Sequence, residues 1–103
     1  MRAVRYSQTF ARQLTDLLKH GVQAFGPDVT AEKRDIVLTT IENTLAAHPA
    51  IKQARADIGL VCYPVAATPF VILYDYDDDV LRVHFILHRH ADIDAVDPTS
   101  VEW

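Results

Sequence analysis

The sequence contains few cysteines and few glycines: one cysteine, Cys62, and three glycines. A single cysteine excludes an intrachain disulfide and a cysteine metal site. There is no Gly-rich phosphate loop, and no apolar run approaches the ~20 residues that a membrane helix needs. The first six residues also lack the apolar stretch of a signal peptide. We therefore expect a cytoplasmic protein with a reduced thiol and no membrane partner.

Basic residues are scarce as well. The chain has 10 Lys and Arg against 14 Asp and Glu, which gives a net charge of −4 and a pI near 5.6. This balance provides no general attraction to nucleic acid phosphates. Much of the acid lies in positions 75–79 and after Asp92, so a local basic patch is compatible with the composition.

Half of the 103 residues are hydrophobic, which is enough for a single core and predicts one domain, residues 1–103. Ala3–Tyr6 alternates like a short strand, and Ser7 is placed to cap a helix that Gly26-Pro27 ends. The apolar stripe of that helix is Phe10, Leu14, Leu17, Leu18, Val22 and Phe25. Gly21 lies inside it as a possible earlier fray point.

A second helix is expected to start at Asp28 or Thr30, to bury Ile36, Val37, Ile41 and Leu45, and to end before Pro49. Strand patterns follow at Ile58–Val65 and on both sides of Asp77–Asp79, which suits a hairpin turn. The order predicts an α+β fold with an N-terminal strand, a helical hairpin and then a three-stranded antiparallel sheet.

The hairpin around Asp77–Asp79 is the most informative stretch. Its first strand is apolar on both faces, which is typical of a central strand. For its second strand, alternation predicts a core face of Leu81, Val83, Phe85 and Leu87. The same alternation predicts an opposite, mostly basic face of Arg82, His84, Ile86, His88 and His90.

Two kinds of chemistry are compatible with that basic face. Histidines on one strand face suggest a metal, but no third ligand has convincing spacing, and we expect no metal or other cofactor. Histidine can act as acid or base with arginines stabilising charge, as a metal-independent ribonuclease requires. The alternative is that the arginines pair with Asp92, Asp94 or the 75–79 turn. Cys62 in an apolar strand is a poor nucleophile.

The order of elements resembles the RelE/ParE superfamily of toxins from type II toxin–antitoxin systems. Residues 69–74, Pro-Phe-Val-Ile-Leu-Tyr, are similar to the Pro-aromatic-aliphatic-Tyr strand of the family. Residues 83–87 followed by His-Arg-His-Ala-Asp at 88–92 are similar to the ParE-type ending. The resemblance covers about residues 2–95 and rests on the combination of these segments.

The resemblance implies a bacterial toxin that a cognate antitoxin holds inactive in a hetero-oligomer. A ParE-like member inhibits DNA gyrase and is not an enzyme. Target or partner contacts then fall on Arg82, His84, His88, Arg89, His90 and Asp92. A RelE-like member is instead an endoribonuclease that cleaves mRNA on the ribosome. Its candidate catalytic residues are His88, His90, Arg82, Arg89 and Arg55.

The two readings differ in the basic residues that they require. The ending at residues 88–92 favours the ParE-like reading. The strand at Leu60–Tyr63 holds no arginine, which counts against cleavage, and the acidic balance also suits a ribosomal nuclease poorly. The sequence leaves gyrase and the ribosome both open as targets.

Overall fold

The computed structural model describes residues 1–103, and its elements follow the predicted order. The helices are α1 (Gln8–Phe25) and α2 (Pro27–Thr39). The strands are β1 (Ala3–Tyr6), β2 (Val61–Pro64), β3 (Phe70–Tyr76) and β4 (Val80–His88). The predicted α+β fold class is therefore confirmed.

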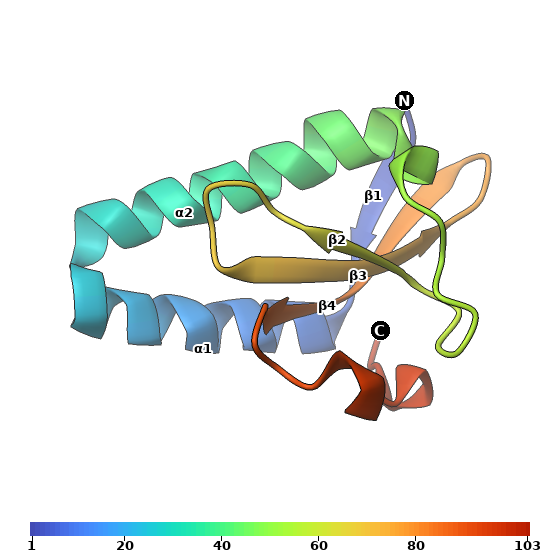
Figure 1. Ribbon diagram of the computed structural model, residues 1–103. Coiled ribbons are helices and arrows are strands. Elements are labelled where there is room, and N and C mark those ends of the chain that lie inside the picture. The colour runs from blue at the N-terminus through green and yellow to red at the C-terminus, as the bar shows by residue number, and fades with distance from the viewer.

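The four strands form one sheet in the order β1-β4-β3-β2. β2, β3 and β4 are antiparallel neighbours, as the sequence predicts. β1 joins the same sheet parallel to β4, with Arg5 opposite Arg82, so the sheet has four strands instead of three. A parallel neighbour needs a crossover connection, and the α1–α2 hairpin is part of it (Figure 1).

Two small residues set the ends of α1, and a third permits its packing on α2. Ser7 caps the helix as predicted, because its Oγ accepts a hydrogen bond from the Phe10 amide at 2.8 Å. Gly26, with φ of 88°, ends it in a conformation that favours glycine. The fray expected at Gly21 is wrong. The helix runs on to Phe25, and a Cβ at Gly21 would lie 2.9 Å from Thr30 Oγ1, so this glycine permits close packing of α1 on α2.

The second helix begins earlier than expected and changes geometry near its end. Pro27 occupies its first turn, where a missing amide costs nothing, so the expected starts at Asp28 and Thr30 lie inside the helix. Thr40–Leu45 is π-helical, a change that apolar spacing did not indicate. The helical stretch ends before Pro49, as predicted.

The larger core lies between the helices and the sheet. Its helical side chains include Phe10, Val37, Ile41 and Leu45, of which the last three are fully buried. The sheet contributes alternate residues of β3 and part of β4: Phe70, Ile72, Tyr74, Leu81, Val83 and Ile86. Residues 70–74 of β3 are buried on both faces, which confirms the prediction of a central strand.

The opposite face of the sheet carries a smaller core that residues after β4 cover. It consists of Ile58, Leu60, Val71, Leu73 and Phe85, against which Ile93, Val96 and Val101 pack. We call residues 94–103 the strap. In Figure 1 the strap, in red, lies beside the start of α1. The Gln8 and Thr9 amides there donate to the Glu102 carbonyl at 2.7 and 3.4 Å.

Candidate functional site

A β-bulge in β4 decides where its polar side chains point. Leu73 of β3 pairs with Phe85, and the next residue, Tyr74, pairs with Val83, so His84 is an extra residue without a partner in the ladder. A bulge of this kind breaks the alternation of side chains along a strand. Periodicity alone cannot locate it.

The hydrophobic contacts show the consequence of the bulge. Leu81 and Val83 pack toward the helices, Phe85 packs on the strap side, and Ile86 returns to the helix side. The predicted core face of Leu81, Val83, Phe85 and Leu87 is therefore wrong. So is the predicted polar face of Arg82, His84, Ile86, His88 and His90. Ile86 belongs to the helix-side core, and the four polar residues divide among three other environments.

Arg82 lies at the turn end of β4 and is held by two carboxylates. Its Nε donates to Asp75 Oδ1 at 2.7 Å, and its Nη1 donates to Asp77 Oδ2 at 2.8 Å. Asp77 also accepts the amides of Asp79 and Val80 through Oδ1. The Arg82 guanidinium, followed by these amides, lowers the pKa of Asp77 to about 2. Arg82 therefore fixes the hairpin turn.

Arg55 is paired as well. Its guanidinium donates to Asp57 at 2.7 Å and to Asp94 of the strap. Its amide donates to the Leu60 carbonyl, just before β2. Arg55 thus joins the segment before β2 to the strap. The expectation that arginines pair with Asp94 or the 75–79 turn holds for Arg55 and Arg82.

His84 is buried beneath the strap, with 8% of its surface exposed. Its ring meets the Trp103 ring edge to face, with centroids 4.8 Å apart. Its Nε2 lies 3.3 Å from Asp75 Oδ1, but neither ring nitrogen has a hydrogen-bond partner. As long as the strap is in place, His84 is not accessible to another molecule.

The exposed end of β4 is the third environment, formed by His88, Arg89, His90 and Asp92. All four residues are exposed. The rings of His88 and His90 lie 5.1 Å apart, and the His90 amide donates to His88 Nδ1. The Arg89 amide donates to the Pro69 carbonyl, while its side chain forms no ion pair. The Arg89 guanidinium and the His88 and His90 rings are therefore available to a partner.

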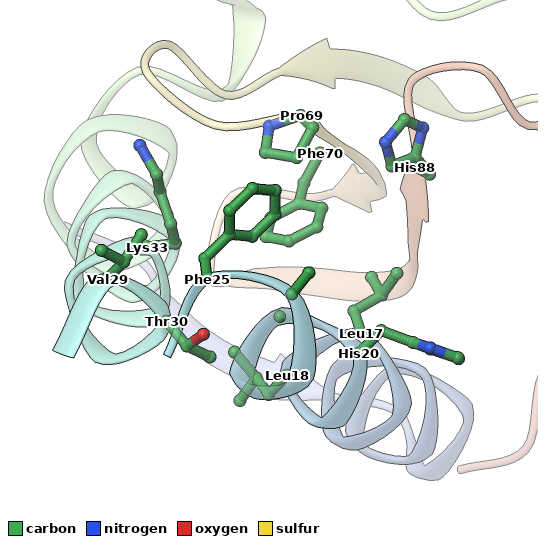
Figure 2. Close-up of a pocket in the computed structure, with 12 residues that line it drawn as sticks. Leu17, Leu18, His20, Phe25, Val29, Thr30, Lys33, Pro69, Phe70 and His88 are labelled. Atoms are coloured by element: carbon green, nitrogen blue, oxygen red, sulfur yellow. The ribbon is translucent and has the colours of Figure 1, made fainter. Parts of the chain in front are cut away.

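A groove of about 330 Å³ opens beside this end of β4, between the two helices and the sheet. Figure 2 shows Phe25 and Phe70 in it, with Lys33 and His88 at opposite rims. The twelve lining residues are Leu17, Leu18, His20, Gly21, Ala24, Phe25, Val29, Thr30, Lys33, Pro69, Phe70 and His88. The groove is thus an apolar channel with the polar side chains of Lys33 and His88 at its edges.

The sequence did not indicate this groove, because helical periodicity identifies the apolar stripe of α1 but not which part of it another layer covers. The C-terminal end of that stripe is instead exposed, with 72% of Phe25 and 45% of Val22 accessible. The usable signal was Gly26-Pro27, which turns the chain at once into α2. The tip of a helical hairpin extends beyond the sheet, so apolar residues there lack a covering layer.

The remaining reactive groups have structural roles. Burial raises the pKa of the Cys62 thiol, which makes a poor nucleophile. Burial also raises the pKa of Tyr74 to about 12, and its hydroxyl donates to the Pro49 carbonyl at 2.7 Å. Burial, followed by a hydrogen bond to Glu42, raises the pKa of Tyr6. No group of three or more His, Cys, Asp or Glu could hold a metal ion.

The candidate nuclease residues do not form one constellation. Arg82 lies at the turn end of β4, Arg55 lies under the strap, and His88 begins the exposed end, six residues or about 20 Å along the strand from Arg82. General acid–base catalysis requires the acid, the base and the charge-stabilising groups around one reacting atom. The exposed end and the groove are better suited to binding. None of the helices has the length and apolarity needed to cross a membrane.

Comparisons with known proteins agree with this architecture. Residues 4–93 match the family described as the ParE toxin of the type II toxin–antitoxin system parDE. A chain of the chromosomal ParDE TA system from P. aeruginosa superposes with a TM-score of 0.73 at 14% sequence identity. The match covers 85% of this chain and 96% of that chain, and it shows the shared fold. Curated protein sequences give no match. Because the family match spans most of the sequence, the chain belongs to the ParE toxin family of type II toxin–antitoxin systems.

Proposed function

We propose that this ParE-family toxin inhibits DNA gyrase by binding it, and that a cognate antitoxin neutralises the toxin. The match of residues 4–93 to the ParE toxin family carries this proposal. The dispersal of Arg55, Arg82 and His88 supports inhibition by binding, since no catalytic group is assembled from them. The proposal places the toxin, as a single domain of residues 1–103, in the bacterial cytoplasm, where gyrase acts.

The contact surface proposed for a protein partner is the exposed end of β4 together with the groove. Arg89 is exposed and forms no ion pair, and the groove beside it presents Phe25, of which 72% is accessible. An apolar centre with a charged rim is the usual composition of a protein interface. Arg82 and His84 fit this role less well, because Arg82 is paired and His84 is covered.

The proposal requires that purified toxin inhibit supercoiling. Relaxed plasmid, gyrase and ATP would be incubated with increasing toxin, and topoisomers would be separated on agarose. We expect supercoiling to fall with toxin concentration and to recover when the cognate antitoxin is added in equimolar amount. Full gyrase activity at a large molar excess of folded toxin would rule out this target.

A second candidate is ribosome-dependent cleavage of mRNA. One observation favours it: the His88 and His90 rings lie 5.1 Å apart at the exposed end, next to the unpaired Arg89. This activity predicts codon-positioned cuts in a translation extract that are lost in the His88→Ala variant. If Arg82 is also catalytic, as the sequence-based candidate set has it, the cuts are lost in Arg82→Ala as well. An extract that shows intact mRNA with the wild-type toxin eliminates the nuclease.

The antitoxin is proposed to form a hetero-oligomer with the toxin. The name of the solved structure describes a ParDE TA system, that is, a toxin and its antitoxin, and this chain shares the fold of the matching chain. If a small open reading frame adjoins the gene, its co-expression with the toxin, followed by co-purification, would identify that partner.

A further inference from the structure

The strap lies outside the part of the chain that the family shares. The family match ends at residue 93, and the strap is residues 94–103. It contains Asp94, Asp97 and Glu102 and no Lys or Arg. Each charged or aromatic side chain that anchors the strap to the rest of the chain contacts an arginine or His84. The strap is therefore an acidic segment lying on a basic surface.

Three arginines from different parts of the chain hold the strap. Arg55 pairs with Asp94, and Arg12 of α1 pairs with Glu102 at 3.3 Å. The Arg5 guanidinium lies over the Trp103 ring, 4.9 Å from its centroid, a cation–π arrangement. The half-buried Val96 and Val101 of the strap pack on the apolar residues of the sheet beneath, so this surface recognises carboxylates, aliphatic groups and an aromatic ring.

The strap covers this surface without burying its own side chains. No residue of the strap is buried, and its hydrogen bonds to Gln8, Thr9 and Arg12 are exposed to solvent. The strap supplies no hydrogen bond to the ring nitrogens of His84 beneath Trp103. Segments with few buried contacts open locally at low cost. A fully integrated structural element would be expected to bury some of its own side chains.

We propose that the strap-side surface of the sheet around Arg5, Arg12 and His84 is an interaction surface for an acidic protein segment that carries an aromatic residue, and that residues 94–103 occupy it in cis. A partner segment of this chemistry displaces the strap and gains the same arginine contacts. The groove lies on the opposite, helix side of the sheet, and the exposed end of β4 begins at His88, beyond His84 along the strand.

A peptide supplied in trans tests the surface directly. The probe is a fluorescein-labelled, C-terminally amidated peptide of residues 93–103, measured by fluorescence anisotropy against two full-length proteins. The double variant Glu102→Lys/Trp103→Ala removes the Glu102–Arg12 pair and the Trp103 contacts with Arg5 and His84, which weakens the hold of the strap on the surface, whereas in the wild-type protein the intact strap competes at millimolar effective concentration. We expect the variant to bind the peptide about tenfold or more tightly than the wild type.

Matched variants show whether the peptide uses the proposed contacts. In the double-variant background, Arg5→Ala should weaken peptide binding severalfold. Arg34→Ala should leave it unchanged, since Arg34 is an exposed arginine that pairs with Asp35 on α2. A peptide carrying the same Glu→Lys and Trp→Ala changes should not bind. Equal effects of the two arginine variants, no peptide binding, or binding of a single-stranded RNA in place of the peptide would overturn the proposal.

The wild-type protein provides an independent measurement, because Trp103 is its one tryptophan. If the strap is exchangeable, Trp103 fluorescence should change at a lower urea concentration than the far-UV circular dichroism of the helices and sheet. Coincident transitions would show that the strap unfolds with the whole chain, and global unfolding of the double variant would show the same. Either result would overturn the proposal.

Discussion

At the turn end of β4, Arg82 donates to Asp75 and Asp77, whereas at the opposite end Arg89 is exposed and forms no ion pair. Both arginines belong to the stretch from Arg82 to Asp92 that the sequence singles out. Their surroundings differ: acidic side chains of the same hairpin surround Arg82, and an apolar groove adjoins the end that carries Arg89. A cation on a strand indicates a binding surface only where the fold leaves it without an acidic partner.

The largest effect is expected from reversing the charge at the exposed end. Arg89→Glu should weaken toxicity about 30-fold, which corresponds to roughly 2 kcal/mol of binding energy, the size of an interface hot spot. The unfolding free energy should change by no more than ~0.5 kcal/mol, because the side chain is exposed and unpaired. The measurement is growth after graded induction, with urea unfolding of the purified variant as the control. Full toxicity would remove Arg89 from the contact surface.

A smaller effect is expected in the groove beside that end. Phe25→Ser removes an aromatic ring that is 72% exposed and lines the groove. Binding to the partner should weaken about tenfold, or ~1.4 kcal/mol, with little loss of stability. Val22→Ser is the matched control, since Val22 is also exposed on α1 but does not line the groove. Equal losses in the two variants would show that the groove has no special role.

At the turn end the expected effect is on stability and not on activity. Arg82→Ala should lower the unfolding free energy by about 1 kcal/mol, because it breaks two partly exposed ion pairs. Toxicity at equal folded concentration should match the wild type. Chemical denaturation and induced growth arrest measure the two quantities. A variant that is stable but inactive would reverse the assignment of the two ends.

The same end should also give the smallest effect, a pH dependence. The pKa of Asp77 is lowered from 3.8 to about 2, chiefly by Arg82. A lowered folded-state pKa stabilises the protein above the unfolded-state value, and this contribution is lost as pH falls from about 4 to 2. Asp77→Asn should therefore show a smaller decrease in melting temperature over that range than the wild type. An identical decrease would mean that the Asp77–Arg82 pair adds no stability.

Local sequence signals predicted the elements well. Ser7, Gly26 and Pro49 mark the helix ends that the structure shows, because caps and breakers act through neighbouring backbone groups. The apolar run of residues 70–74 identified β3 as a central strand for a similar reason: a strand covered on both faces needs apolar side chains on both.

Contacts between distant residues could not be predicted in this way. The bulge at His84 reverses the faces of Ile86 and His88, and it depends on pairing with β3. The parallel pairing of β1 with β4 joins residues more than 70 positions apart, such as Arg5 and Arg82. The burial of His84 depends on Trp103, which lies in a segment that the pattern gave no reason to place on the sheet.

The candidate site was predicted in part. Residues 88–92 were singled out as contacts, and they are exposed and unpaired in the structure, although partner contact itself stays a prediction. The groove was missed, because the stripe that ends at Phe25 has the same spacing whether or not another layer covers it. Coverage is a property of the whole fold, so periodicity cannot supply it.

Titration of purified gyrase against the immobilised toxin would test most directly whether the exposed end of β4 contacts the proposed target. Three full-length proteins are compared in one experiment: wild type, Arg82→Ala and Arg89→Glu. We expect equal dissociation constants for wild type and Arg82→Ala, and a value about 30-fold weaker for Arg89→Glu. Loss of binding in Arg82→Ala with retention in Arg89→Glu would contradict the account, as would a wild-type toxin that does not bind gyrase.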